Sequence, residues 1–173
     1  YEGFKMYEYR AKVIKVIDGD TVDVDIDLGF GIVLSDERVR VMGIDTPESR
    51  TRDLTEKQFG LAAKKRLQEL LGETTILKTE INKNGEDMKG KFGRVLGDFV
   101  TEDGRMATEV MIEEGHCVPY HGQNKDDVAA AHLANRERLI SEGVVKIDYL
   151  GWLYYDYIIQ LTIEEYIKWS KTY

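Results

Sequence analysis

The sequence has 173 residues, a length that suits one domain around one hydrophobic core. Apolar residues make up 42% of the chain and charged residues 32%, the balance of an ordinary globular domain, and no run of about 18 apolar residues is present, which excludes a transmembrane helix. The formal net charge of −8 argues against a general nucleic-acid-binding protein, which is normally basic. Any site for a polyanion must therefore be a local positive patch.

The chain contains one cysteine, Cys117, so an intramolecular disulfide is impossible and a reducing compartment is favoured. The first ten residues, YEGFKMYEYR, lack the apolar segment of a signal peptide. Because the sequence begins at Tyr1 rather than methionine, an exported protein whose leader has been removed stays an alternative to a cytoplasmic one.

Periodicity predicts the elements in chain order. Alternating or β-branched runs predict strands at 8–17, 21–28, 38–44, 74–81 and 94–100. Apolar residues at helical spacing predict helices at 55–71, 105–114 and 125–142, and a capping pattern predicts a further short helix at 163–171. Thr55 and Gln58 fit a capping box for the first helix, and Gly72 is its expected C-cap.

This order, three strands, a helix, two strands and then helices, predicts an α+β fold: a five-stranded β-barrel of the OB type with about three helices. The expected domain covers 1–147. The segment 148–173 has a different character, because it holds both tryptophans and six of the ten tyrosines. We expect it to be a partly helical, aromatic extension that packs on the barrel or on a second copy of the chain, so a homodimer is one possible assembly.

Five aspartates lie close together in VIDGDTVDVDIDLGFG, residues 17–32. Asp23, Asp25 and Asp27 alternate against the apolar set and are expected on the solvent face of the strand, while Asp18 is typical of a turn. Asp20 shares the register of the buried residues, where a carboxylate is costly unless a metal or an arginine compensates its charge. Strand parity therefore singles out Asp20.

A calcium loop of the EF-hand type is the obvious rival for this stretch. Asp23, Asp25 and Asp27 have its D-x-D-x-D spacing, but Leu28 stands at the required glycine and Leu34 at the expected glutamate. The alternation also requires a strand rather than a loop, so this alternative is rejected.

Two further stretches combine polar residues with turn formers. In RVRVMGIDTPESR, residues 38–50, the run Asp-Thr-Pro-Glu follows a strand directly, and taken alone it is typical of a turn before a helix. In GKFGR, residues 90–94, two glycines flank a cation and an aromatic residue, a pattern that taken alone favours a hairpin turn. His116 and His132 are expected at a helix end and on a helix surface.

Taken together and in this order, IDGDT at 17–21, RVRVMGIDTPE at 38–48 and GKFGR at 90–94 resemble the staphylococcal nuclease (thermonuclease) family. The resemblance extends over about residues 8–147. It implies that Asp20 and Asp45 supply carboxylate oxygens and Thr46 a backbone carbonyl to one Ca²⁺, an all-oxygen set that suits this hard cation.

The resemblance also implies the catalytic and substrate-binding residues. Glu48 would orient or deprotonate the attacking water. Arg40 and Arg94 would bind the scissile phosphate, because a guanidinium donates two parallel hydrogen bonds and stays charged. The substrate-binding residues implied by the resemblance are Lys91, Phe92, where the staphylococcal enzyme has a tyrosine, and Tyr120.

The implied reaction is the metal-assisted hydrolysis of DNA or RNA, with single strands favoured, to products that carry a 3′-phosphate. The cationic residues between positions 40 and 94 are expected to form a basic rim around the site. Two alternatives stay open: a catalytically silent binding module for nucleic acid or protein on the same fold, and an interaction protein that acts through its aromatic tail. The intact set of carboxylates and arginines favours the enzyme.

Overall fold

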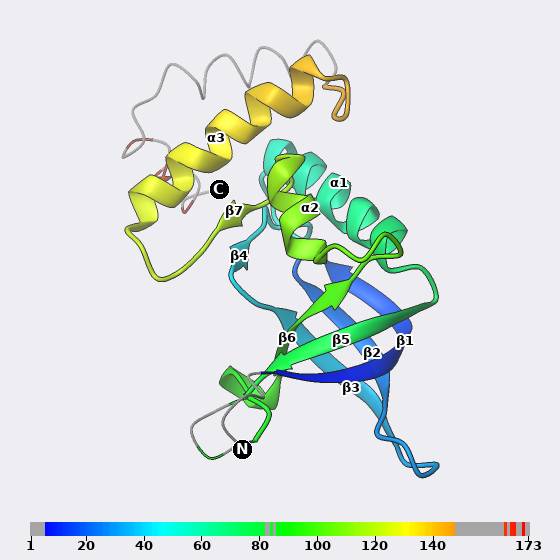
Figure 1. Ribbon diagram of the computed structural model, residues 1–173. Helices are drawn as coiled ribbons and strands as arrows, with labels where there is room; N and C mark the ends of the chain where they lie inside the picture. Colours follow the sequence, from blue (N-terminus) through cyan, green and yellow to red (C-terminus); the bar gives the residue numbers. More distant parts are fainter. Residues whose placement is uncertain are drawn as a thin grey trace.

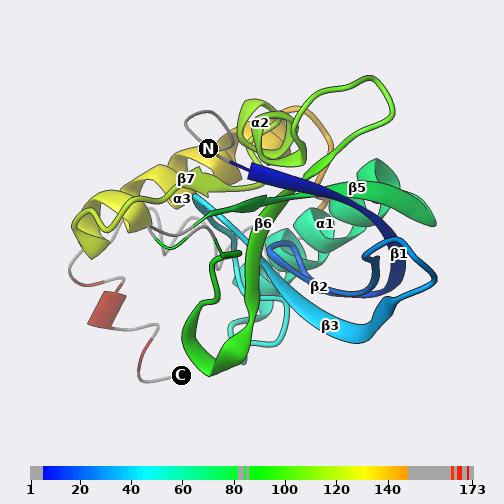
Figure 2. The ribbon, with the colours of Figure 1, turned by 60° about the horizontal axis from the view of Figure 1, so that its bottom comes forward.

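The structure is a computed structural model that describes residues 6–81, 84, 86–147, 165, 167, 168 and 171. Five strands form a closed barrel in the order β1-β2-β3-β6-β5, namely β1 (Met6–Asp18), β2 (Thr21–Asp27), β3 (Val33–Val41), β6 (Val95–Val100) and β5 (Thr74–Glu80). The pair β3–β6 is parallel and the other pairs are antiparallel. The strands curve around a common interior (Figure 2), and the predicted α+β barrel is confirmed.

Three helices lie together on one side of the barrel (Figure 1). They are α1 (Leu54–Leu71), α2 (Ala107–Glu113) and α3 (Lys125–Ser141). A two-stranded sheet of β4 (Ile44–Asp45) and β7 (Val118–Pro119) precedes α3, and a short 3₁₀ turn, η1 (Lys91–Gly93), precedes β6. No helix in the described part of the chain combines the length and apolarity that a bilayer crossing requires.

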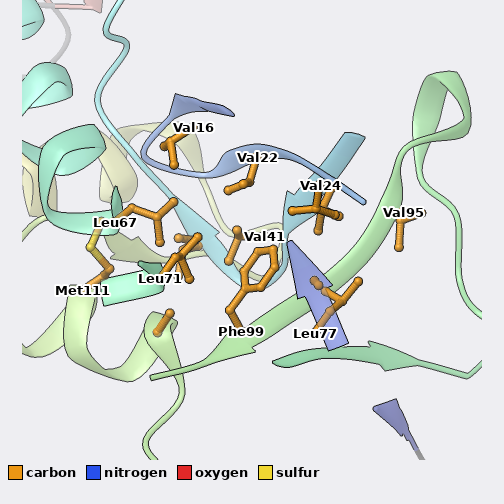
Figure 3. Packing of buried hydrophobic residues seen from close by; sticks show 14 of the residues in the cluster. Val16, Val22, Val24, Val41, Leu67, Leu71, Leu77, Val95, Phe99 and Met111 are labelled. Atoms are coloured by element: carbon orange, nitrogen blue, oxygen red, sulfur yellow. The ribbon is translucent and has the colours of Figure 1, made fainter. Parts of the chain in front are cut away.

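The hydrophobic core joins the barrel to two of the helices. Val22, Val24 and Phe99 fill the barrel, and Leu67 of α1 and Met111 of α2 close it from the helical side (Figure 3). A second, smaller cluster holds α3 on α1, through Leu139 against Phe59. Helices α1 and α2 therefore pack on the barrel, and α3 packs on the outside of α1.

Most boundaries differ from the prediction by one or two residues, and two differences have a clear physical cause. The third strand begins at Val33 instead of residue 38 and ends at Val41, because Gly43, with φ 75°, breaks the run before β4. The N-cap of α1 is Asp53, not Thr55: the Asp53 carboxylate accepts hydrogen bonds from the backbone N–H groups of Thr55 (3.0 Å) and Glu56 (3.1 Å). A side chain at position 53 reaches both donors at once, which is why it takes the cap. The expected C-cap Gly72 is confirmed.

The predicted aromatic extension at 148–173 lies outside the described residues, apart from Glu165, Ile167, Lys168 and Lys171, whose backbone is helical. The boundary at 147 and the expected homodimer thus stay predictions.

Candidate functional site

The turn between β1 and β2 presses directly on α1. A Cβ atom at Gly19 would lie 2.8 Å from the Cβ of Ala63 and 3.2 Å from Cγ2 of Thr46. Only glycine allows this approach, so the glycine of the G-D-T run is needed where the turn, the helix and the segment after β4 meet. The packing brings Asp20 to the same end of the barrel as Thr46, whose side chain is buried.

Asp20 is paired with an arginine, one of the two partners that its register predicted. Its Oδ2 atom lies 3.2 Å from Nη2 of Arg40, and its Oδ1 atom accepts a hydrogen bond from the Thr21 hydroxyl (2.9 Å). The Arg40 guanidinium also donates to the carbonyl oxygens of Val41 and Ile44 (3.0 Å for Ile44). Arg40 therefore bridges the Asp20 carboxylate and the backbone just before Asp45.

Asp45 is held from outside the barrel. Its backbone lies in β4, opposite Val118 of β7. Its Oδ2 atom is hydrogen-bonded to Nε2 of His132 on α3, at 2.7 Å. The prediction that His132 lies on a helix surface was wrong, because its side chain is only 15% exposed and faces this carboxylate.

Glu48 lies near several other carboxylates. Its backbone N–H donates to Oε1 of Glu56 (3.3 Å). Lost solvation raises the pKa of its carboxyl group above the ordinary value, and the negative charges of Asp18, Asp20, Glu56 and Asp45 raise it further. The carboxyl groups expected to bind metal and to act on water are thus brought close enough together to sense one another's charge.

Asp18, which the sequence indicated as a turn residue, is instead the last residue of β1 and connects this end of the strand to the Glu48 segment. Its carboxylate accepts a hydrogen bond from the hydroxyl of Ser49 and lies 3.6 Å from Nη2 of Arg50. Ser49 is buried and Arg50 is mostly exposed. No local pattern links residues so far apart in sequence, so this contact could not be found before the fold was known.

A cavity of about 630 Å³ opens beside this cluster. It is lined by Ile17, Asp18, Thr21, Asp23, Asp36, Glu37, Arg38, Arg50, Phe92, Gly93 and Arg94. Asp20 does not line this cavity, although Asp18 and Thr21 on either side of the turn do. Four carboxylates and three guanidinium groups line the walls, and the expected basic rim is therefore not what surrounds this space.

Asp23 corrects the parity argument. It was expected on a solvated face, but only 9% of the residue is exposed. The reason is the neighbouring strand: Arg38 lies opposite Asp23 in the β2–β3 register and covers it with two parallel hydrogen bonds of 2.7 and 2.9 Å. Asp25 and Asp27 are half-buried.

Three residues of the GKFGR run, Phe92, Gly93 and Arg94, line the cavity. Phe92 is fully exposed and has φ 63°, a conformation that is uncommon for a residue with a side chain. Arg94 donates through Nε to the carbonyl oxygen of Lys91 (3.2 Å), and within the described residues its two Nη atoms have no partner. Of the remaining predicted residues, Lys91 is exposed but does not line the cavity.

Tyr120 lies away from the cavity walls. It is 45% exposed, and its backbone N–H donates to the carbonyl oxygen of Gly43 (2.8 Å), just before β4. The fold therefore brings it near the Asp45 segment.

The oxygen donors of this site decide which kind of cation they suit. In the described part of the chain, no three side chains of the His, Cys, Asp or Glu type form a metal-binding cluster. Asp20 and Asp45 do offer carboxylate oxygens, and His132 holds only one of the two oxygens of Asp45. Two carboxylates completed by a backbone carbonyl and water suit Ca²⁺, which accepts irregular sets of oxygen ligands. The residues present therefore fit this ion.

Comparison with known proteins identifies the family of this chain. The profile of the family described as "Staphylococcal nuclease homologue" matches residues 38–140. The chain belongs to this family. The match includes Arg40, Asp45, Glu48 and Arg94, while the turn that carries Asp20 precedes it.

Curated relatives are named as endonucleases. An uncharacterized endonuclease of Escherichia coli is 25% identical over 137 residues, which are 79% of this chain and 77% of the relative. The SPbeta prophage-derived endonuclease YokF of Bacillus subtilis is 34% identical over 101 residues, 58% of this chain and 31% of YokF. Endonuclease YhcR of B. subtilis is 26% identical over 118 residues, 65% of this chain but only 9% of YhcR. The chain thus spans most of the first relative and a small part of the other two.

Proposed function

We propose that this chain is a Ca²⁺-dependent nuclease that hydrolyses phosphodiester bonds of DNA, RNA or both, favours single strands and leaves 3′-phosphate products. Its membership of the nuclease family and the endonuclease names of its relatives support nuclease activity in general. One observation carries the finer proposal: Glu48, whose pKa is raised by burial and by the nearby charges of Asp18, Asp20 and Asp45, lies beside a cavity that is lined in part by Arg94.

In this proposal Asp20, Asp45 and the carbonyl group of Thr46 hold the cation. When bound, Ca²⁺ supplies positive charge to a phosphate oxygen and lowers the repulsion between the substrate and the acidic cavity wall. This requirement follows from the lining itself, because four carboxylates against three guanidinium groups do not attract a phosphodiester. The same lining argues against a silent nucleic-acid-binding module, which has no reason to oppose the charge of its ligand.

The chain's own residues account for the remaining steps. Glu48 orients the attacking water or accepts its proton, and the water oxygen forms a new bond to phosphorus. The bond from phosphorus to the 5′ oxygen breaks, that oxygen takes up a proton, and the phosphate stays on the 3′ oxygen. Arg94, whose two Nη atoms have no partner in the described structure, donates to the phosphate oxygens as their charge grows.

Unlike Arg94, Arg40 already has partners for its guanidinium group. Its guanidinium is held by Asp20 and by two backbone carbonyls, so it reaches a phosphate only from a fixed position. A preoriented arginine loses little conformational entropy when it binds the transition state. The exposed ring of Phe92 offers a surface for base stacking, which is tolerant of sequence.

The test uses 5′-labelled single-stranded DNA and RNA of equal length in Ca²⁺, in Mg²⁺ and in chelator. We expect cleavage in Ca²⁺ alone and products whose mobility changes after treatment with a 3′-phosphatase. Glu48→Gln should lower kcat by about 10²- to 10⁴-fold, the range for loss of a general base. Glu102→Gln, in an exposed turn, is the matched carboxylate control.

Two results would contradict the proposal. Cleavage in Ca²⁺ that Glu48→Gln leaves unchanged would remove Glu48 from the reaction. No cleavage of either substrate by the unaltered chain, with Ca²⁺ bound, would favour the silent binding module.

A further inference from the structure

Asp45 makes its one side-chain hydrogen bond in the described structure to a helix far along the chain. His132, 87 residues later, places Nε2 at 2.7 Å from Oδ2 of Asp45. The histidine side chain is 15% exposed and the aspartate side chain 39% exposed. A mostly buried imidazole thus restrains a carboxylate that is still open to solvent on one side.

The position of α3 does not depend on this hydrogen bond. The Asn135 side chain donates to the carbonyl oxygen of Cys117 (3.2 Å), and Leu139 packs against Phe59 of α1. Because other contacts hold the helix, His132 can be replaced without removing α3 from its place.

A carboxylate has two oxygens, and its side-chain torsion is free unless something holds one of them. Near Asp45 the carboxylates of Asp20 and Glu48 favour any rotation that takes its charge away from them. A hydrogen bond to Oδ2 opposes that rotation and leaves Oδ1 available. Partners of this kind behind a metal ligand typically change metal affinity by about 10- to 100-fold when they are removed.

We propose that His132 is a positioning residue for the cation site: it holds Asp45 so that one carboxylate oxygen stays available to the ion, and α3 thereby sets the affinity for Ca²⁺. This inference rests on the proposed function, since it requires that Asp45 binds the cation. His132 itself touches neither substrate nor ion. Its effect is on the ligand that it orients.

The test measures Ca²⁺ binding by isothermal titration calorimetry without substrate, so the readout is independent of cleavage. His132→Leu should raise the dissociation constant for Ca²⁺ by about 10- to 100-fold. His132→Gln, whose amide reaches about as far as the imidazole Nε2, should restore it to within about threefold, since the donor is kept. His121→Leu, a change at an exposed histidine outside this contact, should bind Ca²⁺ as the unaltered chain does.

Cleavage at saturating Ca²⁺ provides a second readout: in His132→Leu it should return to within about threefold of the unaltered rate, because the lost affinity is overcome by concentration. If urea unfolding shows that His132→Leu is not folded, His132→Asn carries the same expectation, because its amide is too short to reach Asp45.

The outcomes separate the two proposals. If Asp20→Asn abolishes Ca²⁺ binding while His132→Leu and His132→Asn bind normally, His132 is no positioning residue and the proposed function stands. If Asp20→Asn binds Ca²⁺ normally, the proposed cation site is wrong and this inference falls with it.

Discussion

Gly60 offers the sharpest test of how the fold holds Glu48. It lies on the buried face of α1, and a Cβ atom at this position would lie 2.4 Å from the carbonyl oxygen of Glu48, 2.5 Å from its carbonyl carbon and 2.6 Å from the backbone nitrogen of Ser49. Ordinary contacts of a Cβ atom begin at about 3.4 Å. Gly60→Ala must therefore push the Glu48 backbone away by about 1 Å, since no flexible side chain is there to yield.

The stability change is a difference between two opposing effects. Alanine in place of glycine inside a helix stabilises by about 1 kcal/mol, while overpacking costs about 1–3 kcal/mol. Because the clash is with backbone, we expect the upper end and a net destabilisation of about 2 kcal/mol. Activity should suffer more, because a displacement of about 1 Å at a catalytic group costs about 100-fold in rate.

The assay combines urea unfolding with kcat on single-stranded DNA at saturating Ca²⁺. Lys65→Ala, on an exposed part of the same helix, is the control and should change neither quantity by much. If Gly60→Ala is about 1 kcal/mol more stable than the unaltered chain and cleaves at the same rate, α1 does not hold the Glu48 segment in place.

Three further predictions concern the cavity and one buried histidine. Arg94→Lys keeps the charge but loses the planar fork, so kcat should fall about 10²-fold; an unchanged kcat would mean that charge alone suffices. Asp23→Asn removes one carboxylate from the cavity wall and releases Arg38, so the KM for DNA at low salt should fall about 1.4- to 5-fold, and an unchanged KM would place the substrate elsewhere. Burial lowers the pKa of His116 below its ordinary 6.5, although Glu114 partly opposes the shift. The unfolded chain therefore binds the extra proton first, and stability should fall as the pH drops from about 7 through 6.5 to 5. Over this pH range the urea midpoint of His116→Gln should fall less than that of the unaltered chain. If the two midpoints fall equally with pH, burial of His116 is not the cause of the pH dependence.

The barrel was predictable because each of its strands has a recognisable sequence pattern. Each of the five alternates or concentrates β-branched residues over enough positions to be recognised, and the single long helix between them limits the topologies that remain. The pair β4–β7 was not predicted, because two-residue strands such as Ile44–Asp45 have no period to detect. Its existence depends on tertiary packing, which brings Val118 opposite Asp45.

In the candidate site, too, local patterns predicted some features, while contacts between distant segments could not be predicted. Asp20 was singled out by a strand register that it does not have, because it lies in the turn before β2. Its expected need for a compensating partner is met, since Arg40 provides one. Parity failed for Asp23 because the rule assumes that an outward side chain meets water, whereas Arg38 on the next strand covers it. The partners of Asp18 and Asp45 are 31 and 87 residues away, and no spacing rule applies over such separations.

The two glycines that press on the site explain how like charges stay together. Gly19 joins the turn bearing Asp20 to α1, and Gly60 joins α1 to the backbone of Glu48, each with no room for a methyl group. Repulsion among Asp18, Asp20, Asp45 and Glu48 opposes this arrangement. Burial raises the pKa of Glu48, and this repulsion raises it further. Backbone packing through α1 therefore fixes the separation between the two acidic segments, while Arg40 and His132 hold one carboxylate oxygen on each side. A cation that binds between them gains from repulsion that the fold has already imposed, so ion binding and the stability of this part of the fold should rise together.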